Sequence, residues 1–272
     1  MHEIFSEPFE EEFIVSTILR NNELACRVTK GARYGELTSG ELATLEYRPS
    51  SVFGGILDKD SFYKHTLHPI GVLFDKVRLQ SMLFVPRGNL RICVQCVKED
   101  VNNLGTSYIH RQHVMPGTLV CHLHATNLLD TCPVCNLEIK RHRINKLSAC
   151  ISQINALKVE TSPDSATHRY SQFVHDILRR TDSEKYRRHA LPTMDISLKK
   201  LGYSSSSKTD YSEVCIDADK KIGVGEGLYQ RSSTSKHAGH TPMHSFPRIA
   251  YFIYETVDNF ISEIEEYCSF KP

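Results

Sequence analysis

Two short pairs of metal-binding side chains constrain this chain more than any other feature of its sequence. Cys93 and Cys96 are separated by two residues, and Cys121 and His124 repeat that spacing after residues 97–120. Two intervening residues let both side chains of a tight turn, or knuckle, point the same way, and two knuckles form the tetrahedral cage that Zn²⁺ accepts. Thiolates with one imidazole suit zinc better than hard cations do, so we expect one zinc ion here. Four protein ligands leave no open position for water, and the predicted role is therefore structural.

Two other readings compete with this assignment. His122 is a second imidazole beside Cys121, but its spacing makes a poorer knuckle than that of His124. Alternatively, the cysteines are buried free thiols, which would make both spacings a coincidence. The spacing favours the zinc site with His124 as its imidazole.

A third pair, Cys132 and Cys135, forms half of a second site without an obvious partner pair. Within reach along the chain, only His142 and Cys150 follow it. Two interpretations stay open. Cys132, Cys135, Cys150 and His142 bind a second zinc ion, or the thiols merely pack against their neighbours.

The composition bears on the compartment and on the partners. The chain has nine cysteines, an odd number, and its first residues lack the basic and apolar parts of a secretory signal, which argues against a disulfide framework. No stretch approaches the length of about 18 apolar residues that a membrane span needs. The net charge of +1 excludes a strongly basic nucleic-acid coat protein. We expect a soluble, cytoplasmic protein that binds any polyanion through local patches.

The predicted fold class is mainly α-helical with a small zinc-knuckle module. Residues 1–88 form a helical N-terminal region, and residues 89–150 form the zinc-binding module, whose polar turns rarely carry long regular elements. Residues 151–272 form a helical C-terminal region, for which a helix-turn-helix is one arrangement. Within it, residues 204–244 are rich in Ser, Gly, Thr and Lys and are expected to be a long flexible loop.

In the N-terminal region, the acidic run Glu10-Glu11-Glu12 suits the positive end of a helix dipole, so a first helix is expected to begin there. Shorter helices are expected over residues 40–47 and 71–83, where apolar residues lie between turn-forming segments.

In the C-terminal region, three helices are predicted. Apolar residues recur at helical spacing from Tyr170 to Leu178. A shorter helix is expected from a cap at Thr193 to Leu201, where Gly202 stops it. The clearest pattern runs from Ile249 to Ile264 and predicts one helix with Pro247 at its start.

Basic residues are concentrated between positions 138 and 200, where thirteen Lys and Arg stand against seven acids. Such a segment either contacts nucleic-acid phosphates or forms the solvated faces of helices, since no aromatic residues alternate with the basic ones. The residues proposed for DNA contact are Lys140, Arg141, Arg143, Arg179, Arg180, Arg187 and Arg188.

Motifs of catalysis are missing from the sequence. The chain contains no His-Glu-x-x-His, no Gly-x-Ser-x-Gly and no Walker-type phosphate loop, and no His-x-Glu precedes the cysteine pairs as in zinc deaminases. His110, Arg111 and His113 are close in sequence, but without a nucleophile or an open metal site they indicate packing and hydrogen bonding. We therefore expect no enzymatic activity.

Together these residues resemble the TniQ/TnsD family of transposon target-selection proteins. The resemblance runs from Cys93 to Cys135 and includes the segments His110-Arg111-Gln112-His113 and Met115-Pro116-Gly117. Further similarity lies upstream. The run Glu7-Pro8-Phe9-Glu10-Glu11-Glu12 with Ser16 and Arg20 is similar to the opening of that family, as is His65-Thr66-Leu67-His68-Pro69. The chain departs from the family at Val94, Ile109, His122 and Ala125, where members often carry Pro, an aromatic residue, Pro and Gly.

The resemblance implies a non-enzymatic adaptor that links target recognition to an AAA+ ATPase regulator of the transposase. The target is then either a DNA site that the protein reads directly or an RNA-guided Cascade complex. The oligomeric state stays open, a homodimer included. A zinc-containing DNA-binding transcription regulator is the alternative, which an operator footprint without any effect on transposition would favour. A zinc enzyme is the third hypothesis and requires an open metal position.

Overall fold

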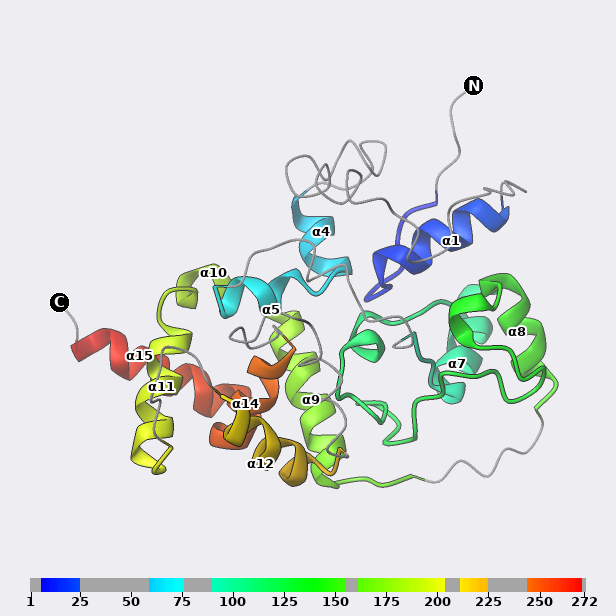
Figure 1. Ribbon diagram of the computed structural model, residues 1–272. Coiled ribbons are helices and arrows are strands. Elements are labelled where there is room, and N and C mark those ends of the chain that lie inside the picture. Colours follow the sequence, from blue (N-terminus) through cyan, green and yellow to red (C-terminus); the bar gives the residue numbers. More distant parts are fainter. Residues whose placement is uncertain are drawn as a thin grey trace, which may run out of the picture.

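The structure is a computed structural model in which six stretches of the chain are described (Figure 1). They are residues 6–24, 59–75, 90–154, 161–203, 211–224 and 244–270.

The described residues form short helices joined by loops, and extended segments pair there only in isolated bridges. The helices of the N-terminal and central parts are α1 (Ile14–Leu24), α4 (Lys59–His65), α5 (His68–Leu73), α7 (Val94–Leu104), α8 (Ile144–Ser152) and the 3₁₀ turns η1 (Arg111–Val114) and η2 (Ile139–Arg141). Those of the C-terminal part are α9 (Ala166–Arg179), α10 (Ser183–Tyr186), α11 (Ala190–Lys200), α12 (Ser212–Ile222), α14 (Ser245–Tyr254) and α15 (Val257–Phe270). The predicted fold class, mainly α-helical with a Cys/His module, is confirmed.

One buried apolar cluster runs through all three predicted regions. It contains Phe13 from the first region, Ile109 and Leu147 from the second, and Phe173 and Phe260 from the third. Figure 1 shows α1, α7 and α8 toward one end of the molecule, α10, α11 and α15 toward the other, and α9 between them. The boundaries between the three regions, at residues 88 and 150, stay a prediction, because the described parts of all three regions share one core.

Helix α1 begins later than the acidic run predicts. The backbone turns at Glu11, whose φ is 57°, and the helix starts only at Ile14. Glu12 is fully buried instead of lying in a first turn, and its carboxylate accepts hydrogen bonds from Ser16 Oγ at 3.0 Å and Arg20 Nη2 at 2.8 Å. A buried carboxylate needs such partners, and they tie residues 6–12 to the helix.

The short helix expected over residues 71–83 is tested only at its start, where residues 71–73 belong to helix α5. Helix α5 begins at His68, carries Pro69 in its first turn, and ends at Leu73. The ring of Phe74, just after it, stacks on Phe246 at 5.7 Å and on Phe260 at 5.9 Å between ring centres. Residues 76–83, like the helix expected over 40–47, lie outside the described residues.

Helix α9 confirms the pattern from Tyr170 to Leu178. Its cap is Ser165, whose hydroxyl accepts a hydrogen bond from the backbone N–H of His168 at 3.1 Å. Helix α11 is present but starts at Ala190, so the predicted cap at Thr193 is wrong. The Thr193 hydroxyl lies inside the helix and donates to the carbonyl of His189.

The single helix predicted from Pro247 to Ile264 is two helices. Glu255 adopts a φ of 62° and ends α14, and the hydroxyl of Thr256 then accepts a hydrogen bond from the backbone N–H of Asn259 at 3.2 Å. Both helices pack on the same core, where the rings of Tyr254 and Phe260 stack at 4.9 Å. The apolar period therefore continues across a break that it does not reveal.

The long loop predicted over residues 204–244 is wrong for residues 212–222, which form α12. This helix buries Val214, Cys215, Ala218 and Ile222 against the core. Most of these side chains are small. The composition of residues 204–244 as a whole is dominated by the polar residues on either side of the helix, so it does not reveal the helix. The central module likewise differs from expectation, since α7 is a regular helix of 11 residues.

None of the described helices combines the length and the apolar character needed to cross a membrane.

Candidate metal centres

The first candidate centre brings together the four side chains predicted from the sequence. The Nδ1 atom of His124 lies 3.5 Å from the sulfur of Cys93, 3.4 Å from that of Cys96 and 3.6 Å from that of Cys121. The sulfurs of Cys96 and Cys121 are 3.5 Å apart. The three cysteines are buried, and so the four donor atoms face an interior point.

These separations fit a tetrahedral zinc ion. With metal–sulfur bonds of about 2.3 Å and metal–nitrogen bonds of about 2.0–2.1 Å, such a site places sulfur about 3.5 Å from nitrogen and about 3.8 Å from another sulfur. The donor set of three thiols and one imidazole is also one that zinc prefers. The residues present therefore fit the predicted ion.

Local structure positions each knuckle. Cys93 is the cap of α7 and Cys96 lies in its first turn, so both sulfurs sit at the positive end of the helix dipole, which favours thiolates. The second knuckle is a loop in which the N–H of Ala125 donates to the carbonyl of Cys121 at 2.9 Å. Ala125 has a φ of 52°, in the left-handed region that favours glycine.

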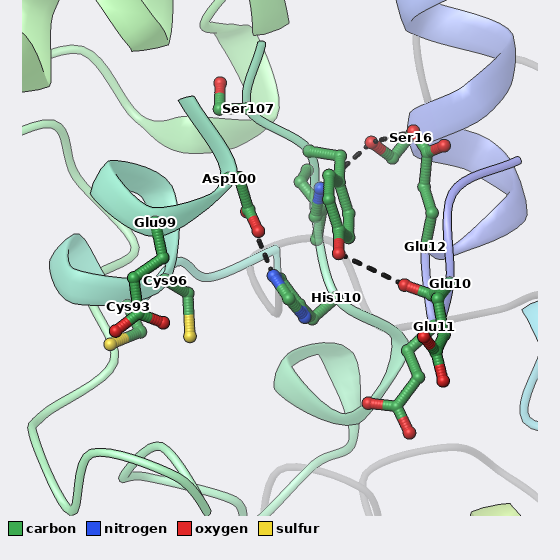
Figure 2. A network of polar contacts seen from close by, with 12 residues as sticks. Glu10, Glu11, Glu12, Ser16, Cys93, Cys96, Glu99, Asp100, Ser107 and His110 are labelled. Carbon is green, nitrogen blue, oxygen red and sulfur yellow. Dashed lines mark hydrogen bonds and ion pairs between the residues drawn. The ribbon is translucent and has the colours of Figure 1, made fainter. Parts of the chain in front are cut away.

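Outer contacts fix the imidazole of His124. Its Nε2 atom, which faces away from the cluster, lies 2.9 Å from the carboxylate of Glu99 on α7. Ligating histidines commonly donate their second ring N–H to a carboxylate, which fixes both tautomer and orientation. Figure 2 shows Cys96 and Glu99 on the same helix, beside Cys93.

His122, the competing imidazole of the sequence, is used elsewhere. Its ring stacks on that of His175 on α9, with ring centres 4.0 Å apart. His175 in turn hydrogen-bonds Asp176 and Glu11 through its two nitrogens, each at 3.2 Å. Burial opposes the charged form of His175, but these two bonds outweigh it and raise its pKa to about 9. A protonated imidazole offers no lone pair to a metal, so Glu11, His122 and His175 form an ion pair with a stacked ring.

The thiols of the first centre need a cation to ionise together. Contacts with the sulfurs of Cys121 and Cys96 hold the pKa of Cys93 well below its ordinary value. Contacts with Cys121 and Cys93 raise the pKa of Cys96 far above that value, and contact with Cys93 raises the pKa of Cys121 to about 12. Only one of the three sulfurs thus readily becomes a thiolate by itself, and a bound cation would stabilise all three.

The second candidate centre joins the four side chains for which the sequence leaves two interpretations open. Donor atoms of Cys132, Cys135, His142 and Cys150 lie within 4.8 Å of one another, and the sulfur of Cys150 is 3.5 Å from Nε2 of His142. The other ring nitrogen of His142 lies 2.8 Å from the carbonyl oxygen of Arg143. Both centres thus combine three thiols with an imidazole whose outer nitrogen has a partner, an arrangement that could hold a second metal ion.

The second centre is assembled from a knuckle and a helix. Cys132 and Cys135 lie in a loop where the N–H of Asn136 donates to the carbonyl of Cys132 at 2.9 Å. Cys150 comes from α8, which packs against α7, the helix that carries the first centre. The backbone N–H of Leu137 lowers the pKa of the exposed Cys135 thiol to about 7, which favours a thiolate ligand.

Changing Ala125→Gly is expected to stabilise the protein by up to about 1 kcal/mol, because the left-handed conformation costs an alanine about 1–2 kcal/mol and glycine almost nothing. Urea unfolding in the presence of zinc measures the change. The matched control is Ala149→Gly on the exposed side of α8, which is expected to destabilise by about 1 kcal/mol. Two changes of the same sign would contradict the role assigned to the backbone at Ala125.

The basic residues proposed for DNA contact are divided between two places. Lys140 and Arg141 both pair with Glu138, at 2.8 and 3.1 Å, just before α8. At the other end of the view in Figure 1, beside α10, Arg180 pairs with Asp182. The candidates therefore do not form one continuous surface, and intramolecular acids neutralise part of their charge.

Arg187 is also paired, with Asp75 at 2.6 Å and Glu184 at 3.2 Å. The remaining candidates, Arg143, Arg179 and Arg188, are exposed, and within the described ranges no ion pair engages their side chains. These three are the candidates best placed to contact a phosphate.

His110 and Arg111 have structural roles. Nε2 of His110 lies 3.0 Å from the carboxylate of Asp100 on α7, as Figure 2 shows. Arg111 donates to the backbone carbonyls of Tyr63 and Leu178 at 2.9 and 2.8 Å. Sequence reasoning did not identify Glu99 and Asp100 as functional residues. Glu99 lies three residues after Cys96 on α7 and contacts the ligating His124, so a carboxylate at this spacing is a signal that could have identified it.

The fold and the centres define a mainly α-helical protein with two Cys₃His clusters braced by helices. No known protein-family profile matches the chain. No curated protein matches it either.

Proposed function

We propose that this protein is a target-selection adaptor of a transposition system, related to the TniQ/TnsD proteins. It would link a target, either a DNA site or an RNA-guided Cascade complex, to an AAA+ ATPase regulator and through it to the transposase. In this proposal both Cys₃His clusters hold zinc, which folds the scaffold and performs no chemistry. The protein itself is not an enzyme.

The observation that supports the proposal is that the separate segments carrying the resemblance pack as one unit. Ser16 Oγ accepts a hydrogen bond from the backbone N–H of Ile109 at 2.9 Å, between the first segment and the zinc-motif segment. Nδ1 of His65, in the His-Thr-Leu-His-Pro segment, lies 3.0 Å from the carbonyl oxygen of Glu12. The Tyr108 hydroxyl donates to the carbonyl of Glu10 at 3.1 Å, and Figure 2 shows that His110, which follows in the same segment, contacts Asp100 of α7.

This packing gives the motif residues a joint role. They lie far apart in sequence, and a set of unrelated short matches would not be expected to meet in one buried network. A rigid scaffold of this kind suits an adaptor, because its partner surfaces have to keep a fixed relation to each other while the metal centres hold short helices in place. In this proposal the exposed side chains of Leu119, just before the second knuckle, and of Leu123 within it provide apolar surface for partners.

The proposed function is tested in a transposition assay with the transposase and AAA+ regulator of the same element. Deleting the protein is expected to abolish insertion at the selected target, and the purified chain is expected to retain the regulator in a pull-down. A chain that leaves insertion unchanged but protects a specific operator from nuclease would be a transcription regulator, contrary to the proposal.

For direct DNA reading, charge reversal at Arg179 and Arg188 is expected to weaken binding to a duplex carrying the insertion site. Each lost phosphate contact lowers the slope of log affinity against log salt by about 0.9, so the double variant should lose about 2. Fluorescence anisotropy over a salt series measures the slope. Lys146→Glu on α8, an exposed basic residue outside the proposed contact set, is the control at the other end of the molecule. Equal losses per reversed charge in both variants would indicate a general charge effect and contradict a contact surface beside α10.

A further inference from the structure

His113 is the most completely isolated polar side chain next to the first centre. It lies in η1, its residue is 1% exposed, and neither of its ring nitrogens has a hydrogen-bond partner in the part of the chain that the structure describes. An imidazole carries at least one N–H in each of its charge states, so the ring always has a donor to satisfy. Leaving a buried donor unsatisfied costs about 1–3 kcal/mol, and such a group calls for a specific explanation.

The sulfur of Cys121 is a potential acceptor near the His113 ring, without a hydrogen bond to it in this structure. Ligand atoms of His113, Cys121 and His122 lie within 4.8 Å of one another, and all three residues are buried. His122 is already occupied by its contacts with Gln112 and the ring of His175. On the other side, the His113 ring faces that of His110 at 5.0 Å, and the Nε2 of His110 is engaged by Asp100.

We propose that His113 is a positioning residue of the first centre, whose ring N–H donates a hydrogen bond to the thiolate of Cys121 when the metal is bound. This inference rests on the metal binding in the proposed function but not on transposition. A metal-bound thiolate keeps negative charge on its sulfur, and a charged acceptor roughly doubles the strength of a hydrogen bond. The contact satisfies the buried donor and withdraws charge from the sulfur.

His113 as a ligand of a further ion is the competing reading. That ion would have to share Cys121 with the first centre, where the Cys121 sulfur already lies 3.5 Å from that of Cys96 and 3.6 Å from Nδ1 of His124. The first centre already has four donors without His113. The ring therefore contacts a ligand of the metal and not the metal itself. Such partners orient ligands, and replacing them typically weakens metal binding 10- to 100-fold.

Two variants of nearly equal side-chain length separate these roles. His113→Gln keeps an N–H donor, whereas His113→Met removes it. In the cobalt-substituted protein, the thiolate-to-cobalt charge-transfer band is expected to move to longer wavelength for the Met variant and to stay close to wild type for the Gln variant. Metal competition with a chelator should show a 10- to 100-fold loss for Met alone. Native mass spectrometry should count the same number of ions in all three proteins.

A band that is identical in the Gln and Met variants would overturn the proposal, and so would the loss of one bound ion in either variant, which would make His113 a ligand. The wild-type protein offers a test that does not depend on the folding of variants. After substitution with ¹¹³Cd, the His113 ring proton should show scalar coupling to the metal across the hydrogen bond to Cys121, and its absence would refute the contact. Failure in the transposition assay would leave each of these measurements intact, so the two proposals fail separately.

Discussion

Substituting Cys121→Ser is expected to lower the zinc content from two ions to one and to unfold the segment around the first centre. Binding of structural zinc contributes about 10–16 kcal/mol in zinc-finger peptides, which is as large as the whole stability of about 5–15 kcal/mol of an ordinary domain. Cys121 is fully buried and faces the other three donors, so a serine there leaves two thiols and an imidazole without their fourth partner. Native mass spectrometry counts the ions, and far-ultraviolet circular dichroism follows the helices.

The matched control is Cys268→Ser on α15, a partly buried thiol remote in sequence from both clusters. It is expected to retain both ions and the wild-type spectrum. A Cys121→Ser protein that keeps two ions and its helical signal would show that the first cluster is merely a group of packed thiols. A wild-type count of one ion would instead restrict metal binding to a single cluster.

Replacing Asp219→Ala is expected to destabilise the protein by about 3–5 kcal/mol, because it leaves the guanidinium of Arg248 buried without a counter-ion. The pair joins α12 to α14, and both side chains are 1% exposed. The Arg248 Nη1 donates to the Asp219 carboxylate, and Nη2 donates to Ser245 Oγ at 2.9 Å. Urea unfolding with zinc present measures the loss.

The double variant Asp219→Leu with Arg248→Met removes both charges and is expected to recover much of this stability, because replacing a whole buried pair by apolar residues is often neutral. The exposed Lys200–Glu263 pair serves as a surface control, where Lys200→Ala should cost less than about 1 kcal/mol. If Asp219→Ala were as stable as Lys200→Ala, the Asp219–Arg248 pair would not stabilise the packing of α12 on α14.

The first centre was predictable because its signal is local. The spacing within each pair predicts a knuckle, for Cys93 with Cys96 and for Cys121 with His124. A few backbone hydrogen bonds within each turn then set the knuckle geometry. Helix α9 was predictable for a similar reason, since one face of a 3.6-residue period is buried along its length. Where chemistry and period act over a few residues, sequence reasoning succeeds.

The second centre and α12 depend on tertiary context instead. Cys150 and His142 carry no knuckle spacing, and they meet Cys132 only because α8 folds back on the module. In α12, the polar Asp219 occupies a core position, which its pairing with Arg248 makes tolerable. The break at Glu255 escapes a periodic pattern because both flanking helices face one core. The sequence names the candidates for the second centre but does not show that they meet, and it shows neither the Asp219–Arg248 pair nor the break at Glu255.

The docking of the opening segment onto the middle of the chain also affects how the protein folds during synthesis. The backbone N–H of Phe13 donates to the carbonyl of Ile109 at 2.8 Å, and that of Arg111 donates to Glu11 at 2.9 Å. During synthesis, residues 6–24 can therefore form these contacts only after their partners, about a hundred positions later, have left the ribosomal exit tunnel. Contacts so distant in sequence slow folding, and until they form the apolar face of α1 has no core to pack against.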